Sequence, residues 1–243
     1  TPLSVVGEVK ASLRSLQLLL DELTAPRRDA YASLLRQAQV RRSAQRRALD
    51  AEADAGMDAQ TIPPLVAARE AVRAIGADVA IVDEAIATSG HVRRFLDSDS
   101  PNQYSFLRGG GLGWGMPAAV GCSLGLGREP VVCMVGDGAA LYSPQALWTA
   151  AHEALPVTFV VMNNREYNVL KNFMKSQENY LSARERRFIA MDIDNPAIDY
   201  TALARSFGLS ARSVTRARDV APAIEAGLAC GCANVVEVMI GTT

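Results

Sequence analysis

Two short apolar runs, each ending in small or polar residues, constrain the fold of this 243-residue chain more than any other feature. Val131–Val135 is followed by the Gly-Asp-Gly motif Gly136–Gly138, and Val157–Met162 is followed by Asn163–Asn164. Both runs have the length and the branched composition of buried parallel strands. The 24 residues between the two polar motifs leave room for one crossover helix. The segment therefore predicts a strand, a loop, a helix, a second strand and a second loop.

The helix between these strands has recognisable ends. Ser143 is a favourable N-cap, Pro144 suits the first turn, and Pro156 ends the pattern. The apolar residues between them share one helical face: Ala146, Leu147, Ala150, Ala151 and Ala154. A right-handed crossover places the loops after both strands at the same edge of a parallel sheet, where open α/β sheets bind their ligands.

Oxygen donors gather at this expected edge. Asp137 has a carboxylate, Asn164 has an amide oxygen, and a backbone carbonyl just after the Asn pair offers a third. Such oxygens suit Mg²⁺ or Ca²⁺, and Mg²⁺ needs only one or two carboxylates when substrate phosphates complete its coordination. Taken singly, each motif is also typical of an ordinary turn after a strand. Their pairing on neighbouring strand ends favours a metal and diphosphate site.

A glycine-rich stretch, Gly109–Gly121, precedes these motifs. Within it, Gly113–Ala118 fits the loose dinucleotide pattern G-x-G-x-x-A, which should directly follow a strand and precede an acidic residue for the ribose. Ser105–Arg108 is a poor strand, so this context is lacking and a nicotinamide dehydrogenase is disfavoured. No G-x-x-x-x-G-K-[ST] motif occurs, which also disfavours a P-loop NTPase.

The remaining pattern predicts the fold class. Glu84–Ser89 is expected to form a polar loop after the first strand. Further along, Asp199 is expected to be the N-cap of a helix that ends at Gly208. The other expected elements are helices at 63–75, 199–207 and 219–229 and strands at 77–83, 214–216 and 235–240. This alternation predicts an α/β fold with a doubly wound, mostly parallel sheet and helices on both faces.

Composition narrows the class of protein further. The net charge is −1, which argues against nucleic-acid binding, and no 18-residue apolar run or basic leader indicates a membrane span or a signal peptide. Three of the four cysteines, Cys122, Cys133, Cys230 and Cys232, lie in apolar or glycine-rich surroundings typical of buried thiols. No second Cys or His cluster joins Cys230 and Cys232, so this pair is expected to be structural or incidental and not a metal or redox site. A reduced, cytoplasmic protein is predicted.

The two motifs and their spacing resemble the thiamine-diphosphate-dependent enzymes of the 2-oxo acid decarboxylase and acetolactate synthase type, whose cofactor motif runs from GDG to NN. The glycine-rich stretch resembles the segment that these enzymes place before the diphosphate loop. Tyr142–Ala151 and Met162–Tyr167 look particularly similar to benzoylformate decarboxylases. The resemblance covers nearly the whole chain and implies the thiamine-diphosphate-binding fold.

The resemblance also implies site residues. Asp137, the side chain of Asn164 and the backbone carbonyl of Glu166 match the metal ligands for Mg²⁺, with Ca²⁺ as an alternative. Gly136, Gly138, Ala139 and Tyr167 fall where the family contacts the diphosphate, although the family often has Ser or Thr at the position of Ala139.

Two residues of the glycine-rich stretch match the family's catalytic positions. Gly110 matches the residue whose backbone carbonyl accepts a hydrogen bond from the 4′-amino group of the cofactor's aminopyrimidine. Leu112 matches the bulky apolar residue that holds the cofactor in its bent conformation. Phe106 and Phe173 match positions that line an aromatic substrate pocket in benzoylformate decarboxylase-like enzymes; core packing is the alternative for both. Neither His91, expected in a loop, nor His152, on the crossover helix, matches a catalytic histidine.

Three regions are expected along the chain: 1–25 as a remnant of a preceding middle domain, 26–60 as a helical linker, and 61–243 as the cofactor domain. Between Pro26 and Leu49 the linker holds seven Arg and one Asp, which is typical of a solvated helix. In the family, a front domain of a second subunit supplies a glutamate that activates the cofactor. The expected partners are therefore missing N-terminal domains and a second subunit, in a homo-dimer or homo-tetramer.

The implied activity is non-oxidative decarboxylation of a small 2-oxo acid to an aldehyde, with the isolated chain inactive because its front domain is missing. An acetolactate-synthase-like carboligase shares every cofactor residue named above and stays open as an alternative. A non-catalytic cofactor-binding fragment is the alternative from another class of protein.

Overall fold

The computed structural model describes residues 4–96 and 103–242 of the chain. The chain divides into two compact units, Thr1–Ala51 and Glu52–Thr243. Within the described residues, no helix is both long enough and apolar enough to cross a membrane.

The first unit is helical. Helix α1 (Val9–Thr24) is capped by the side chain of Glu8, which accepts from Lys10 N at 3.0 Å and Ala11 N at 2.6 Å. A short 3₁₀ turn, Ala25–Arg27, leads into the arginine-rich helix α2 (Arg28–Ala55), whose last residues belong to the second unit. None of the residues of α1 is buried, and its leucines are about half exposed or more.

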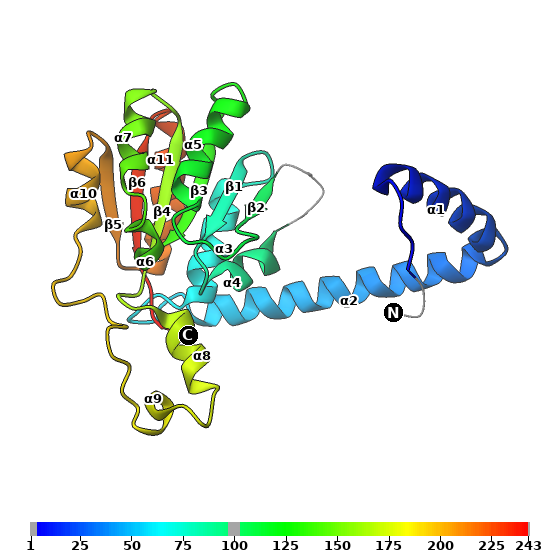
Figure 1. Cartoon of the computed structure of the whole chain (residues 1–243), viewed down its shortest axis with the longest axis horizontal. Coiled ribbons are helices and arrows are strands. Elements are labelled where there is room, and N and C mark those ends of the chain that lie inside the picture. Colours follow the sequence, from blue (N-terminus) through cyan, green and yellow to red (C-terminus); the bar gives the residue numbers. More distant parts are fainter. Residues whose placement is uncertain (1–3, 97–102, 243) are drawn as a thin grey trace. The chain divides into compact units, whose positions relative to one another are not determined.

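The second unit is built around a six-stranded sheet in the order β2-β1-β3-β4-β6-β5, and every neighbouring pair is parallel (Figure 1). The strands are β1 (Ala80–Glu84), β2 (Tyr104–Phe106), β3 (Val131–Gly136), β4 (Val157–Asn163), β5 (Ser210–Val214) and β6 (Asn234–Met239). The two runs that open the sequence argument are the central pair, in register from Val131↔Val157 to Gly136↔Met162. Both are buried almost throughout, which explains their continuous apolar sequence.

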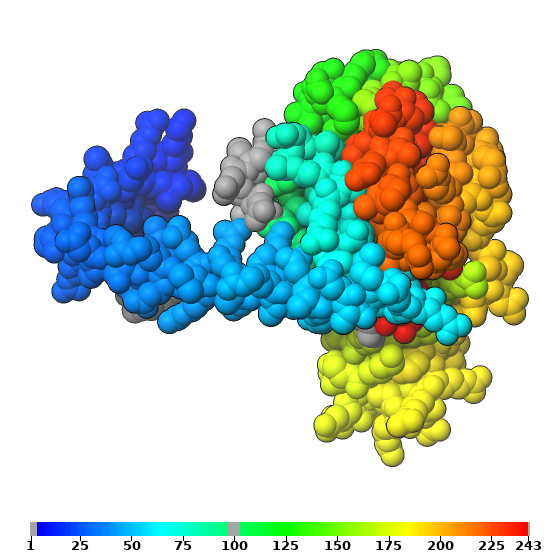
Figure 2. Space-filling view, turned by 180° about the vertical axis from the view of Figure 1, so that it is seen from behind, coloured from blue at the N-terminus to red at the C-terminus, as the bar shows by residue number. Residues whose placement is uncertain are grey.

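Helices cover both faces of this sheet, which confirms the doubly wound α/β fold (Figure 1). One face carries α5 (Gly115–Gly125), α7 (Gln145–His152) and α10 (Tyr200–Ser206), which pack on alternate strand residues such as Cys133 and Phe159. The other carries α3 (Pro64–Ile75), α4 (Ser89–Phe95) and α11 (Val220–Ala229). Figure 2 shows this second face, with α3 in cyan beside α11 in orange-red.

Three shorter helices lie near the carboxyl edge of the sheet. They are α6 (Asp137–Ala140), α8 (Asn168–Lys175) and α9 (Leu181–Arg184). The predicted cap of α10 is confirmed, because the Asp199 side chain accepts from Ala202 N at 2.8 Å and Gly208 follows the helix with φ +87°.

Several details of the sequence prediction are wrong. Ser143 does not cap the crossover helix: Pro144 holds the N-cap position of α7 without a side-chain bond, because the Ser143 hydroxyl donates to Gly113 O instead. Ser105–Arg108 was expected to be a poor strand, but Tyr104–Phe106 forms the short strand β2 through its pairing with β1.

The strand expected at 214–216 lies earlier, as β5, because only Val214 of this edge strand is well buried and Arg216 instead forms an ion pair with Asp219 at 2.9 Å. His91 lies in α4 and not in a loop, because Thr88 and Ser89 turn the chain into a helix through backbone bonds to Ala85 O at 2.7 and 2.9 Å.

Candidate functional site

A pocket with about 470 Å³ of empty space opens at the carboxyl ends of β1, β3 and β4. Its walls come from five segments far apart in the sequence: the end of β1 with the loop after it, Leu112 of the glycine-rich stretch, the Gly-Asp-Gly motif with α6, the Asn-Asn loop with the start of α8, and Ile240 after β6. Residues expected at the site that line it are Leu112, Gly136, Asp137, Gly138, Ala139, Asn164, Glu166 and Tyr167. The crossover topology brings both motifs to one place, as the sequence predicted.

Asp137 is a buried acid that lines this pocket and begins α6. Its Oδ1 accepts from the backbone N–H of Gly138 at 2.9 Å, whereas its Oδ2 is buried and has no hydrogen-bond partner among the described residues. Burial raises the pKa of Asp137 to about 6, although the hydrogen bond from Gly138 N and the nearby backbone N–H groups of Arg165 and Asn164 oppose this shift. An unsatisfied carboxylate oxygen is costly in a buried place, so it marks a position for a cation.

The Asn-Asn loop is shaped by its own side chains. Asn163 donates to Glu237 Oε1 at 2.8 Å and accepts from Arg165 N at 3.0 Å, while Asn164 Oδ1 accepts from Glu166 N at 3.1 Å. Arg165 has a left-handed backbone with φ +59°. Asparagine favours such turns because its side chain bonds the backbone two residues on. The turn presents Asn164 and Glu166 to the pocket.

The loop is also held against the segment before α10. Tyr167 N donates to Met191 O at 2.8 Å, and Ile193 N donates to Arg165 O at 2.7 Å. Lys171, which is buried on α8, forms ion pairs with Glu166 and with Asp192. These contacts fix the backbone on both sides of Glu166.

Contacts between the two motifs complete this side of the pocket. The ring of Tyr167 lies against Gly138, and the buried hydroxyl of Tyr200 donates to the backbone carbonyl of Asp137 at 2.8 Å. Burial, followed by the nearby charge of Asp137, raises the pKa of Tyr200, which keeps this hydroxyl protonated as a donor. The backbone of Asp137 is thus anchored independently of its carboxylate.

Glu84 was not identified as a site residue from the sequence. It ends β1, it is fully buried, and it lines the pocket. Its Oε1 accepts from Gly113 N at 2.7 Å and Trp114 N at 3.2 Å, and its Oε2 accepts from Gly115 N at 2.6 Å. The sequence feature that could have indicated Glu84 is an acidic residue at the end of a strand. Its hydrogen-bond partners lie 29 to 31 residues further along the chain, so no local pattern reveals them.

The glycine-rich loop has backbone conformations that require glycine. Gly110 has φ +69° and Gly113 has φ +92°, and a Cβ at position 113 would lie 2.7 Å from the Cβ of Tyr142. The hydroxyl of Ser143 donates to Gly113 O at 2.7 Å, which joins this loop to the segment after α6. Leu112 lines the pocket and is 39% exposed, whereas Gly110 is not among the lining residues.

The two phenylalanines expected near the substrate lie elsewhere in this unit and do not line the pocket. Phe106 ends β2 and is half-buried, with the Arg93 guanidinium 4.7 Å from its ring centroid. Phe173 is an exposed residue of α8, edge-on to Tyr180 with centroids 6.2 Å apart.

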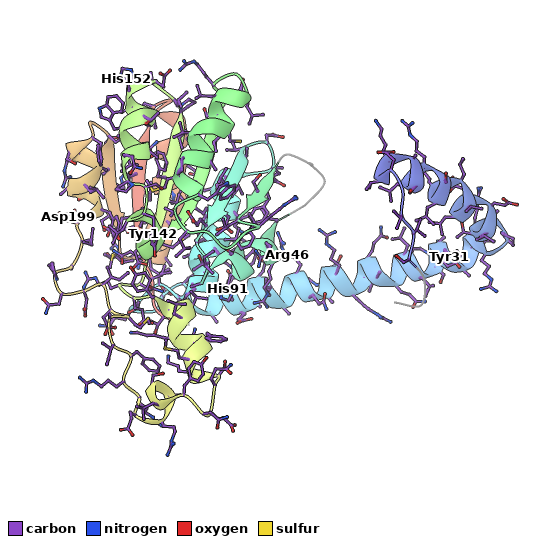
Figure 3. The ribbon with its side chains drawn as sticks, in the orientation of Figure 1. Tyr31, Arg46, His91, Tyr142, His152 and Asp199 are labelled. Carbon is purple, nitrogen blue, oxygen red and sulfur yellow. The ribbon has the colours of Figure 1, made fainter. Side chains whose placement is uncertain are left out.

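The histidines and loop hydroxyls have local roles. Figure 3 shows His91 and His152 at opposite ends of the sheet, and His152 stacks on Trp148 with centroids 4.8 Å apart. Thr88 Oγ1 donates to Ala85 O at 3.0 Å and Ser89 Oγ to Asp83 Oδ1 at 2.9 Å, so both hydroxyls already have acceptors. The four cysteines are free thiols, but only Cys133 is buried; Cys122 is half-buried, and Cys230 and Cys232 are exposed, so the expectation of three buried thiols is wrong.

The oxygen atoms that line the pocket suit a hard cation whose remaining coordination positions are filled by a bound ligand. Among residues 4–96 and 103–242, no group of three His, Cys, Asp or Glu side chains forms a complete metal cage. Glu84 and Glu166 also line the pocket, but their carboxylates are engaged by backbone N–H groups and by Lys171. The Asp137 carboxylate and the Asn164 amide oxygen are left for a cation, and Mg²⁺ commonly completes such a set with phosphate oxygens and water.

Comparison with known proteins identifies the family to which this chain is related. Residues 85–238 match the family model described as "Thiamine pyrophosphate enzyme, C-terminal TPP binding domain". The chain is 32% identical over 161 residues to benzoylformate decarboxylase of Pseudomonas aeruginosa, covering 66% of this chain and 29% of that protein. It is 36% identical over 120 residues to the acetolactate synthase large subunit of Parasynechococcus marenigrum, covering 48% and 18%.

Solved structures show the same likeness. The chain is similar to a thiamine diphosphate-dependent 4-hydroxybenzoylformate decarboxylase of Rhodococcus jostii RHA1, with TM-score 0.69 and 29% identity over 76% of this chain and 33% of that one. It is also similar to benzoylformate decarboxylase from Polynucleobacter necessarius, with TM-score 0.69 and 26% identity over 76% and 34%. The chain spans about a third of the length of curated relatives that match it over about two thirds of its own residues (34% and 29%).

Proposed function

This chain belongs to the thiamine pyrophosphate enzymes and carries their C-terminal cofactor-binding domain, and we propose that it binds Mg²⁺ and thiamine diphosphate in a protein that decarboxylates a 2-oxo acid to an aldehyde. The observation that carries the metal is Asp137, whose buried Oδ2 lacks a hydrogen-bond partner within the described structure. A cation there would satisfy that oxygen and remove the cost of burying a charge.

The residues that would hold the group are those that line the pocket. Asp137 and Asn164 would bind the metal by their side-chain oxygens, with the backbone carbonyl of Glu166 as the third ligand. Gly136, Gly138, Ala139 and Tyr167 would surround the diphosphate, since α6 begins there and its first N–H groups suit an anion. Leu112 and Gly110, from the loop that Glu84 anchors, would lie beside the thiamine part.

When bound, thiamine diphosphate supplies a nucleophilic carbon and an acceptor for the electrons that decarboxylation releases. The chain's own residues bind and orient. Lys171 fixes Glu166 through an ion pair, Tyr200 fixes the backbone of Asp137, and the apolar side chain of Leu112 would exclude water from the reacting side. Phe106 and Phe173 remain proposals for the wall of an aromatic substrate pocket that further protein must complete.

A second candidate is an acetolactate-synthase-like carboligase, favoured by the 36% identity to an acetolactate synthase. For either activity we propose that the N-terminal domains typical of these enzymes and a second subunit complete the site, in a homo-dimer or homo-tetramer. We also propose that the chain alone turns over no substrate, and that its free cysteines reflect a reduced, cytoplasmic setting. Aldehyde as the product of a 2-oxo acid would indicate the decarboxylase, and an acetohydroxy acid the carboligase.

Calorimetric titration of the 243-residue chain with thiamine diphosphate tests the cofactor site. Binding should need Mg²⁺ and should be lost in Asp137→Ala, while Asp58→Ala serves as a control because the Asp58 side chain is 95% exposed. Binding that is equal with and without Mg²⁺, or unchanged in Asp137→Ala, would contradict the metal assignment.

A further inference from the structure

The carboxylate of Glu84 occupies the place at the start of α5 where a helix would otherwise offer free N–H groups to a ligand. Both of its oxygens are used, by Gly113, Trp114 and Gly115, at 2.6 to 3.2 Å. The side chain is fully buried at the end of β1. Charge-assisted bonds to backbone N–H groups are strong and directional, so they fix this loop in one position.

We propose that Glu84 is a positioning residue that fixes the glycine-rich loop for the thiamine part of the cofactor and keeps phosphate away from that loop. This assignment rests on the function proposed above. A glycine-rich loop that opens a helix is a common phosphate site in α/β proteins. Here the internal anion already fills it, which leaves the diphosphate to the Gly-Asp-Gly motif and the Asn-Asn loop on the other side of the pocket.

The packing around Glu84 supports a tight fit. A Cβ on Gly115 would lie 2.7 Å from the Cβ of Glu84 and 2.8 Å from its Oε2, so only glycine lets the helix start approach the carboxylate. Gly113 is also held from its other side, by the Ser143 hydroxyl at 2.7 Å. Leu112, one residue before this anchor, lines the pocket. Moving the anchor would therefore displace Leu112.

The neighbouring acid Asp83 provides a matched control. It is also fully buried, but successive strand residues point to opposite faces. Its carboxylate accepts from Ala85 N at 2.8 Å, Ser89 Oγ at 2.9 Å and the Tyr104 hydroxyl at 2.7 Å, and so anchors the start of α4 and β2. Asp83→Asn removes an equally buried charge without releasing the glycine-rich loop.

The experiment compares two probes on the 243-residue chain with Mg²⁺: thiamine diphosphate and inorganic pyrophosphate. In Glu84→Gln an amide NH₂ must face backbone donors, so the loop loses its anchor. The affinity for thiamine diphosphate should fall about tenfold or more while that for pyrophosphate stays within about twofold. Glu84→Asp keeps the charge on a shorter side chain and should lie between wild type and Glu84→Gln. Asp83→Asn should leave the ratio of the two affinities unchanged.

Amide hydrogen exchange gives a readout that does not depend on binding. Protection of the Gly113 and Gly115 amides should fall in Glu84→Gln and persist in Asp83→Asn. An unchanged ratio of affinities, or unchanged protection of these amides, would overturn the assignment of Glu84. A wild-type chain that binds neither probe would instead contradict the proposed function, and this role with it, so the two failures are distinguishable.

Discussion

The ring of Tyr167 lies directly against Gly138, so that a Cβ at position 138 would come within 2.5 Å of the ring carbon Cε1 and 3.3 Å of Ile193 Cδ1. The two residues belong to the Asn-Asn loop and to the Gly-Asp-Gly motif. Backbone bonds from Tyr167 to Met191 and from Ile193 to Arg165 hold together the chain segments that carry the Tyr167 and Ile193 side chains. The missing side chain of Gly138 is therefore what lets the two halves of the pocket meet.

Gly138→Ala should separate these halves. The methyl group would force the ring of Tyr167 outward, because the backbone bonds that hold these segments together leave little room to relax. We expect thiamine diphosphate affinity in the presence of Mg²⁺ to fall at least about tenfold, with a loss of about 1–3 kcal/mol in unfolding free energy. Calorimetric titration and urea denaturation measure the two effects.

Gly121→Ala is the matched control for this substitution. Gly121 lies on α5, and a Cβ there would meet nothing within 4 Å. Alanine favours a helix over glycine, so this variant should be at least as stable as wild type and bind the cofactor equally well. Equal losses in both variants would show that contact with Tyr167 is not the cause.

The metal-free protein should depend on pH through Asp137. Burial raises the pKa of this carboxyl from 3.8 to about 6, so between these values the folded chain holds a proton that the unfolded chain has released. Stability then falls as pH rises through this interval, by about 3 kcal/mol at pH 7. Asp137→Asn removes the buried charge and should raise the melting temperature of the metal-free protein at pH 7.5, but not at pH 4.

Thermal unfolding with and without Mg²⁺ and thiamine diphosphate checks this prediction. At pH 7.5 the pair should stabilise the wild-type chain and leave Asp137→Asn unchanged, because the amide is a poor substitute for the anionic ligand. Asp58→Asn, at a side chain that is 95% exposed, should follow wild type at every pH. A melting temperature of Asp137→Asn below that of metal-free wild type at pH 7.5 would refute the assignment of an unpaired buried charge.

Local sequence was sufficient for the central sheet and for the paired motifs. Val131–Val135 and Val157–Met162 are long branched runs that end in turn-forming residues, and their crossover fixes where Asp137 and Asn164 lie. Asp199 was equally readable, since its cap involves only the next three residues. These features depend on neighbours in sequence, so their pattern survives without tertiary information.

Features that depend on distant partners could not be read in this way. Glu84 is defined by N–H groups about 30 residues away, and the need for glycine at position 138 comes from a ring in another loop. The edge strand β5 has a single well-buried apolar residue, Val214, so its position follows from pairing with β6 and not from periodicity. Pairing and packing decided these places, which explains why the strand expected at 214–216 was misplaced.

Tyr200→Phe should test the anchor on the Asp137 backbone. The hydroxyl of Tyr200 is buried and its 2.8 Å bond to Asp137 O is the contact that it loses. We expect a loss of about 1 kcal/mol in unfolding free energy and weaker Mg²⁺-dependent cofactor binding, because the carbonyl and the carboxylate belong to one residue. Tyr142→Phe, at an exposed tyrosine of the same half of the unit, should change neither quantity. If Tyr200→Phe loses stability but binds the cofactor unchanged, the hydrogen bond from Tyr200 to Asp137 O does not contribute to the binding site.

Lys171→Met should loosen the Asn-Asn loop. Lys171 has an 11% exposed side chain and pairs with Glu166, which is 13% exposed, and with Asp192, which is 58% exposed. Methionine fills a similar volume but leaves Glu166 as a largely buried carboxylate without its cation, so we expect a loss of about 2 kcal/mol in urea denaturation.

The control for this change lies one turn along the same helix. Lys175 is exposed, with Nζ 3.4 Å from Asn172 Oδ1 and 5.8 Å from the centroid of Phe188, and Lys175→Met should cost less than about 0.5 kcal/mol. Lys171→Met should also weaken Mg²⁺-dependent binding of thiamine diphosphate, because Glu166 adjoins the proposed metal ligands, whereas Lys175→Met should not. If the two variants lose equal stability and bind alike, the Lys171 ion pairs do not shape the metal loop.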